Sequence, residues 1–145
     1  MISGCTIETG DKLPSRARRL IKKDDVILSS IEGSLDSIAL VTDEYDSAIC
    51  STGFYVVKSK YINPETLTLL FKNKYIQMIL KQECSGTILT NVTKDNLAKV
   101  VLPIINKEIQ ELISSKIQQA LNDYKEANDI YISIMSKIDS LYFDI

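Results

Sequence analysis

In the stretch "INKEIQELISSKIQQALNDYKEANDIYISIMSKIDSLYFDI", residues 105–145, apolar residues recur at alternating spacings of four and three, which is the strongest periodic signal in the chain. This heptad pattern predicts one continuous helix with an apolar seam. No glycine or proline interrupts the segment, and Asn106 can cap its first turn. A helix over residues 107–141 would be about 50 Å long at 1.5 Å per residue. The seam positions are Ile113, Ile117, Ala120, Tyr124, Ala127, Tyr131, Ile134, Ile138 and Leu141.

A seam of this length needs a partner helix, because the remaining residues, about 100 of them, cannot fold over all of it. Burying one isoleucine or leucine side chain is worth about 1.5–3 kcal/mol, so leaving the seam in water would forgo about ten kcal/mol or more. The chain offers no second helix of similar length. We therefore expect the partner to come from another molecule, most simply in a two-fold homodimer. Ala120 and Ala127 alternate with tyrosines, which favours antiparallel packing, and the helix could equally serve oligomerisation alone.

The preceding residues 1–104 are expected to form a separate domain rich in β-structure. Short β-branched runs are separated by turn-forming residues around Gly33, at residues 43–46 and at Gly53. This pattern predicts a small, mostly antiparallel sheet and an α+β fold class. Neither glycine belongs to a nucleotide-binding motif. The expected strands cover residues 26–31, 37–41, 48–50 and 54–57.

A second helix is predicted after Asn63, which can act as its N-cap, with Pro64 at the first helical position. Residues 84–86 would end this helix, Thr93 would cap a single further turn, and residues 99–104 look like a strand. The apolar face expected to pack on the sheet consists of Leu67, Leu70, Phe71, Tyr75, Met78 and Ile79.

Residues 12–23, "KLPSRARRLIKK", hold six basic residues and no acidic one. One interpretation is a stripe that faces the phosphates of a nucleic acid, since lysine and arginine neutralise backbone charge and release counterions. The alternative is the solvated face of a helix whose apolar residues pack inward. The apolar residues at helical spacing are Leu13, Ala17, Leu20 and Ile21.

Composition narrows the function classes further. The net charge of −2 and the pI near 5.2 argue against a protein that coats nucleic acid indiscriminately, although a local basic patch remains possible. Three widely spaced cysteines and no histidine indicate reduced thiols and no mixed zinc site. No apolar run approaches the ~20 residues of a membrane span, and the N-terminus lacks the pattern of a secretory signal. We expect a soluble, cytoplasmic protein that does not contact membranes.

Catalysis is not expected. The sequence contains no recognisable nucleophile–base pair, metal-ligand cluster or phosphate-binding loop. It also lacks the Asp/Asn-Pro-Pro-Tyr/Phe motif with which amino-methyltransferases hold a flipped base. An enzyme that uses carboxylates alone stays open as a minor alternative. We therefore predict a protein without cofactor or metal.

Four stretches, in this order, resemble the specificity subunit of type I restriction–modification systems. "LIKKDDVILSSIEGSLDSIALV" (residues 20–41) is similar to that family's lysine-glycine-aspartate stretch, and "YINPETLTLLFKNKYIQMIL" (61–80) to its Asn-Pro-opened helix. "SGTILTNVTKDNLAKVVLPI" (85–104) is similar to its Ser-Gly-Thr loop, capped turn and Leu-Pro strand. "INKEIQELI" (105–113) resembles the Glu-x-Gln start of its spacer helix. Asp24 departs from the family glycine, and Ile105 and Asn106 replace its double proline.

The resemblance implies a target-recognition-like DNA-binding domain over residues 1–104, shortened at its N-terminus, and a spacer helix over residues 105–145. It implies double-stranded DNA and methyltransferase subunits as partners, and a homodimer that rebuilds the two-domain arrangement of the full-length subunit. Residues 82–104 would connect the DNA-binding part of the domain to the spacer helix. We thus predict a non-catalytic DNA sequence-recognition subunit; the alternative is an interaction module that dimerises without binding DNA. The expected DNA-facing residues are Arg16, Arg18, Arg19, Lys22, Lys23, Gly86, Thr87 and Asn91.

Overall fold

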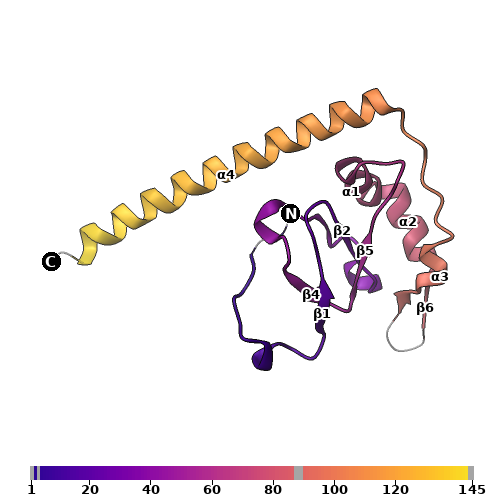
Figure 1. Cartoon of the computed structure of the whole chain (residues 1–145), viewed down its shortest axis with the longest axis horizontal. Coiled ribbons are helices and arrows are strands. Elements are labelled where there is room, and N and C mark those ends of the chain that lie inside the picture. Colours follow the sequence, from indigo (N-terminus) through magenta and orange to yellow (C-terminus); the bar gives the residue numbers. More distant parts are fainter. Residues whose placement is uncertain (1, 3, 87–89, 144–145) are drawn as a thin grey trace. The chain divides into compact units, whose positions relative to one another are not determined.

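The structure, a computed structural model, describes residues 2, 4–86 and 90–143. The chain divides into two compact units, Met1–Asn106 and Lys107–Ile145. The first unit contains short strands and helices, and the second is a single long helix (Figure 1). Within the part of the chain that the structure describes, no helix has an apolar stretch that could cross a bilayer.

Among its described residues the first unit has seven short strands, which pair only in antiparallel fashion in three small sheets. The sheets have the strand orders β1-β4, β3-β2-β5 and β6-β7. The predicted α+β class and antiparallel pairing are confirmed, but the expectation of one sheet is wrong. The strands are β1 (Ala17–Leu20), β2 (Val26–Ser29), β3 (Ile38–Leu40), β4 (Ile49–Ser51), β5 (Phe54–Val57), β6 (Cys84–Ser85) and β7 (Asn91–Val92). The short 3-10 turns are η1 (Gly10–Lys12), η2 (Glu32–Ser34) and η3 (Asp43–Tyr45).

The central strand β2 is buried on both faces, and this explains why its sequence is a continuous apolar run rather than an alternating one. Val26 and Leu28 belong to one core cluster, which also contains residues of the helices that follow the sheet. Ile27 points to the opposite side and belongs to a second cluster with Ile21 and Val41. The strand therefore separates a helix-covered core from a core shared with β1 and β4.

Two helices stand where the sequence predicted one: α1 (Pro64–Lys72) and α2 (Lys74–Gln82). The predicted cap is confirmed, because the Asn63 side chain accepts a hydrogen bond of 2.9 Å from the Thr66 backbone N–H. Asn73 breaks the helix and caps α2 through a 2.9 Å bond from the Tyr75 N–H.

The break shifts the buried face of the second helix, so half of the predicted apolar face is wrong. Leu67 and Phe71 are buried as expected, but Ile76 and Leu80 carry the core contacts of α2. A continuous helix would keep one face inward over both segments. Because the chain changes direction at Asn73, the exposed residues are instead Tyr75, Met78 and Ile79.

The segment that joins the helices to the second unit differs from its prediction at both ends. Cys84–Ser85 forms strand β6 rather than a loop. Thr93 caps the short helix α3 (Lys94–Leu97) as predicted, with Oγ1 accepting from the Asn96 N–H at 3.2 Å. Residues 99–104 form no strand, because their alternation reflects packing and not pairing: Val100 and Leu102 pack against the core, and Val101 is exposed.

Helix α4 (Lys107–Phe143) is one uninterrupted helix of 37 residues (Figure 1). At 1.5 Å per residue it is about 55 Å long, slightly longer than the helix predicted from the heptads. The predicted long C-terminal helix is thus confirmed.

A tight turn at residues 22–25 leads from β1 into β2. The Asp25 N–H donates to the Lys22 carbonyl at 3.0 Å, and the Asp25 carboxylate accepts from the Lys22 N–H at 2.9 Å. Asp24 sits in this turn with a φ of 66°, a left-handed conformation that glycine adopts at no steric cost and aspartate tolerates. The turn thus gives a physical reason for a glycine at this position.

Candidate nucleic-acid interface

The basic segment forms strand β1, so the helical alternative considered for it is wrong. Antiparallel pairing places Leu20 opposite Ile49, and flanking bonds join the Thr52 N–H to the Arg16 carbonyl at 2.7 Å and the Ile21 N–H to the Ala48 carbonyl at 2.9 Å. These backbone bonds to β4 prevail over the helical spacing of the apolar residues.

Alternation along β1 gives its arginines different surroundings. Ala17 and Arg19 are half-buried, whereas Arg18 and Leu20 are exposed. An irregularity in the register between Ala17 and Arg19 shifts the strand locally. Such a bulge re-aims the side chains on either side of it.

Arg16 and Arg19 both lie against the segment that runs from β4 to β5. The Arg19 guanidinium carbon is 5.5 Å from the centre of the Tyr55 ring, which is a cation–π contact. Arg16 Nη2 lies over the buried Gly53, where an added Cβ atom would stand 3.2 Å from it. Two predicted DNA-facing residues therefore contact a segment whose residues were not among the expected DNA-facing ones.

The other basic candidates are engaged differently. Lys23 Nζ forms a 2.8 Å ion pair with Asp43, and this partner raises the pKa of the lysine. The Lys23 N–H donates to Asp46 at 2.8 Å and thereby lowers the pKa of that carboxyl. Arg18 Nε donates to the Ser15 carbonyl at 2.6 Å. Lys23 thus has two acidic neighbours, which weaken its attraction for a phosphate.

Strand β7 lies next to Tyr55 of β5. The Tyr55 hydroxyl donates to the Val92 carbonyl at 2.9 Å, and Asn91 bridges Ile31 and pairs with Ser85 of β6. Tyr55 therefore connects Arg19 to the strand that carries Asn91.

The loop between β6 and β7 contained two further predicted residues. Gly86 has a φ of 134°, a region that favours glycine. Thr87 lies outside the described residues. Beside this loop, the Thr90 hydroxyl donates to the Glu32 carboxylate, and the Glu32 N–H donates to the Thr90 carbonyl at 3.1 Å. An acidic side chain therefore stands next to the predicted DNA-facing residues.

Tyr55 and Gly53 could have been suspected from the sequence. Gly53 lies between two predicted strands, and Tyr55 stands two residues later in the second of them. Their closeness to Arg16 and Arg19 could not be inferred, because the contact depends on which strand pairs with β1.

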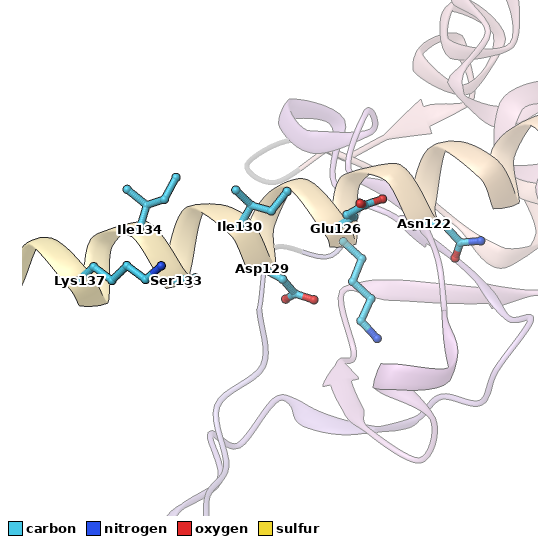
Figure 2. Close-up of a pocket in the computed structure, with 8 residues that line it drawn as sticks. Asn122, Glu126, Asp129, Ile130, Ser133, Ile134 and Lys137 are labelled. Atoms are coloured by element: carbon cyan, nitrogen blue, oxygen red, sulfur yellow. The ribbon is translucent and has the colours of Figure 1, made fainter.

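In the single chain the apolar seam of α4 is exposed from Ala120 to Leu141, whereas Ile113 and Ile117 are half-buried. Ile134 is 51% exposed and Leu141 is 74% exposed. A shallow groove runs along residues 122–137 of the same helix, and Figure 2 shows Ile130 and Ile134 projecting from one side of the helix and Asp129 from the other. The groove lies wholly on this one helix, so a second helix could lie along it beside Ile134.

In residues 2, 4–86 and 90–143, no three His, Cys, Asp or Glu side chains are gathered so that they could hold a metal ion. The cysteines Cys5, Cys50 and Cys84 are free, and burial raises the pKa of the Cys50 thiol. The candidate interface therefore consists of Arg16 and Arg19, which lie against Gly53 and Tyr55, and of the neighbouring strand β7.

The chain is similar to known proteins in both sequence and structure. Residues 7–134 match the family described as the type I restriction modification DNA specificity domain. Among curated proteins, the chain is 32% identical over 130 residues to the type I restriction enzyme HindI specificity subunit of Haemophilus influenzae. That alignment covers 86% of this chain and 28% of the relative.

Solved structures agree with the sequence comparison. The HsdS subunit from Thermoanaerobacter tengcongensis matches with a TM-score of 0.63 and 30% identity, over 83% of this chain and 32% of that one. A structure from work on complex assembly and conformational transition of the type I R-M system matches with a TM-score of 0.63 and 31% identity, over the same shares. The chain thus spans about a third or less of the length of these relatives. The family inferred from the four motifs is confirmed, and the chain belongs to the type I restriction–modification DNA specificity family.

Proposed function

We propose that the chain is a non-catalytic DNA sequence-recognition element of a type I restriction–modification system, acting as a whole subunit or as part of one. The observation that carries the proposal is the pair Arg16 and Arg19, which lie against the segment from β4 to β5, beside the strand that carries Asn91. In a chain of this family, such a surface suits the phosphate backbone of double-stranded DNA, because guanidinium groups bind phosphate oxygens with charge-assisted bonds.

The charge distribution supports a local contact rather than general coating of DNA. The chain is net acidic at −2, yet residues 12–23 contain six basic residues. Phosphate contacts fix the position of a protein on the duplex, and contacts to base edges specify the sequence. The candidates for phosphate contact are Arg16, Arg18, Arg19 and Lys22. Lys23 is a weaker candidate, because its acidic neighbours reduce its attraction for a phosphate. Gly86, Thr87 and Asn91 are the other expected DNA-facing residues.

We further propose that α4 pairs with the same helix of a second copy, through the seam from Ile113 to Leu141. The exposed seam supports this, since seam residues such as Ile134 and Tyr131 are more than half exposed in the single chain. Two-fold pairing would present two recognition units to one DNA molecule. Methyltransferase subunits would supply the chemistry, which the chain itself is not expected to perform, and such complexes would act in the cytoplasm.

The test is selection of duplexes from a randomised library by the purified chain, alone and after mixing with modification subunits from its own source. We expect one sequence to be enriched when the modification subunits are present. The double variant Arg16→Glu/Arg19→Glu should lower the affinity at least about tenfold, since each charged hydrogen bond is worth about 1.5–3 kcal/mol.

The matched control is Lys72→Glu/Lys81→Glu, which changes the net charge equally on helices α1 and α2. It should leave DNA affinity close to that of the unmodified chain. A chain that dimerises yet enriches no sequence, even with modification subunits present, would be an interaction module and would refute the proposal.

A further inference from the structure

We infer that the segment from β4 to β5 positions Arg16 and Arg19 for phosphate contact, with Gly53 and Tyr55 as the positioning residues. This rests on the proposed function and adds to it two residues that do not themselves carry charge. Neither residue is among the basic or polar side chains expected to face DNA.

Tyr55 holds Arg19 through a contact at each end of its side chain. Its ring lies 5.5 Å from the Arg19 guanidinium carbon, and its hydroxyl donates to the Val92 carbonyl at 2.9 Å. The hydroxyl bond fixes the ring against β7, and the ring in turn limits where the guanidinium can lie. Arginine loses much rotamer freedom on binding, so restraint before binding lowers that cost.

Gly53 leaves room for the Arg16 guanidinium because it has no side chain. The glycine is buried, its carbonyl accepts from the Ser30 hydroxyl and the Ser30 N–H, each at 2.9 Å, and Arg16 Nη2 lies over it. A Cβ atom there would stand 3.2 Å from Arg16 Nη2, so the guanidinium would have to move by a few tenths of an ångström. The next nearest atoms are Ser51 Oγ at 3.5 Å and Ile31 Cδ1 at 3.8 Å, both at ordinary contact distance.

The two arginines therefore lie at and beside β1, over two residues of the segment from β4 to β5. By contrast, the Arg18 side chain donates to the Ser15 carbonyl three residues away, and Lys23 pairs with acidic side chains. Arg16 and Arg19 are thus the two basic candidates whose guanidinium groups lie against this segment among the described residues.

The experiment measures the affinity of the full chain for a fluorescein-labelled duplex of about three helical turns, ~30 base pairs, across a series of salt concentrations. Tyr55→Leu should weaken binding about two- to fivefold, the value of a cation–π contact. It should also lower the slope of log affinity against log salt concentration by as much as about 0.9, the value of one phosphate contact. Tyr55→Phe, which keeps the ring, should recover most of that slope.

Gly53→Ala separates positioning from folding. We expect it to keep or slightly raise thermal stability, because alanine restricts the unfolded chain, while it lowers the salt slope as Arg16→Gln does. Combined with Arg16→Gln it should cause no further loss, and Tyr55→Leu should likewise add nothing to Arg19→Gln. The control is Tyr75→Leu, which removes a ring that lies 5.0 Å from Lys74 on α2 and should leave the slope unchanged.

The outcomes separate the two proposals. If the unmodified chain binds DNA and both Tyr55→Leu and Gly53→Ala keep its slope, the positioning role is refuted and the proposed function stands. If losses from Tyr55→Leu and Arg19→Gln simply add, Tyr55 does not act through Arg19. If the unmodified chain does not bind duplex DNA even with modification subunits present, both proposals fail.

Discussion

Replacing Ile134 by aspartate tests the role of the α4 seam. In the single chain Ile134 is 51% exposed, so pairing can bury about half of a side chain whose full burial is worth about 1.5–3 kcal/mol. Each copy then loses about 1 kcal/mol of apolar burial. Each copy also places a carboxylate at a site that a partner would cover, at a cost of at least about 1–3 kcal/mol.

Because a two-fold dimer carries the change twice, Ile134→Asp should cost about 4–8 kcal/mol of association free energy. That corresponds to a rise of about 10³- to 10⁶-fold in the dimer Kd. Sedimentation equilibrium over a range of concentrations measures it directly: the unmodified chain should approach twice its 16.3 kDa mass, and Ile134→Asp should stay at 16.3 kDa.

The control is Ser136→Asp, which adds the same charge at an exposed position two residues further on, on the opposite side of the helix from the seam. It should dimerise as the unmodified chain does. Circular dichroism checks that the helix content of all three proteins is equal. The reasoning is refuted if Ile134→Asp keeps the dimer mass, or if the unmodified chain stays monomeric at every concentration.

Three further changes test the first unit. Asp24→Gly should raise the free energy of unfolding by up to about 1 kcal/mol, because Asp24 has a φ of 66°; a loss of stability in urea would contradict this. Leu80→Ala should cost about 2–5 kcal/mol, because Leu80 is fully buried, whereas the exposed Leu69→Ala should cost far less in the same urea titration. The Lys23 N–H lowers the pKa of Asp46, so the ionised Asp46 stabilises the fold above the ordinary carboxyl pKa of 3.8, and this stabilisation is lost as the pH falls. Asp46→Asn should therefore make the melting temperature less sensitive to acid. An unchanged pH profile of the melting temperature would exclude this role.

Local signals predicted several elements correctly. Asn63 and Pro64 specify where α1 begins, and Thr93 specifies the start of α3, because capping joins a side chain to a backbone N–H two or three residues away. Turn-forming residues between short β-branched runs likewise indicated strands β2 to β5 within one or two residues.

Where a segment's structure depended on a distant partner, local spacing misled. Residues 17–20 have apolar residues at helical spacing, yet they form a strand because β4 supplies the backbone partners. Residues 99–104 alternate like a strand but have no strand partner, so they pack without pairing. Asn73 fits a helical pattern, yet it ends one helix and begins the next, which turned the predicted face of α2 outward.

The long helix, its apolar seam and the family could all be predicted from the sequence, because heptads and caps depend on neighbouring residues and the family motifs follow one another along the chain. Which basic residues lie together, and which residues they contact, follows only from the tertiary structure. Arg19, Tyr55 and Val92 are far apart in the chain, and their contacts follow from strand pairing, which depends on the burial and hydrogen bonding of the whole unit and not on local spacing.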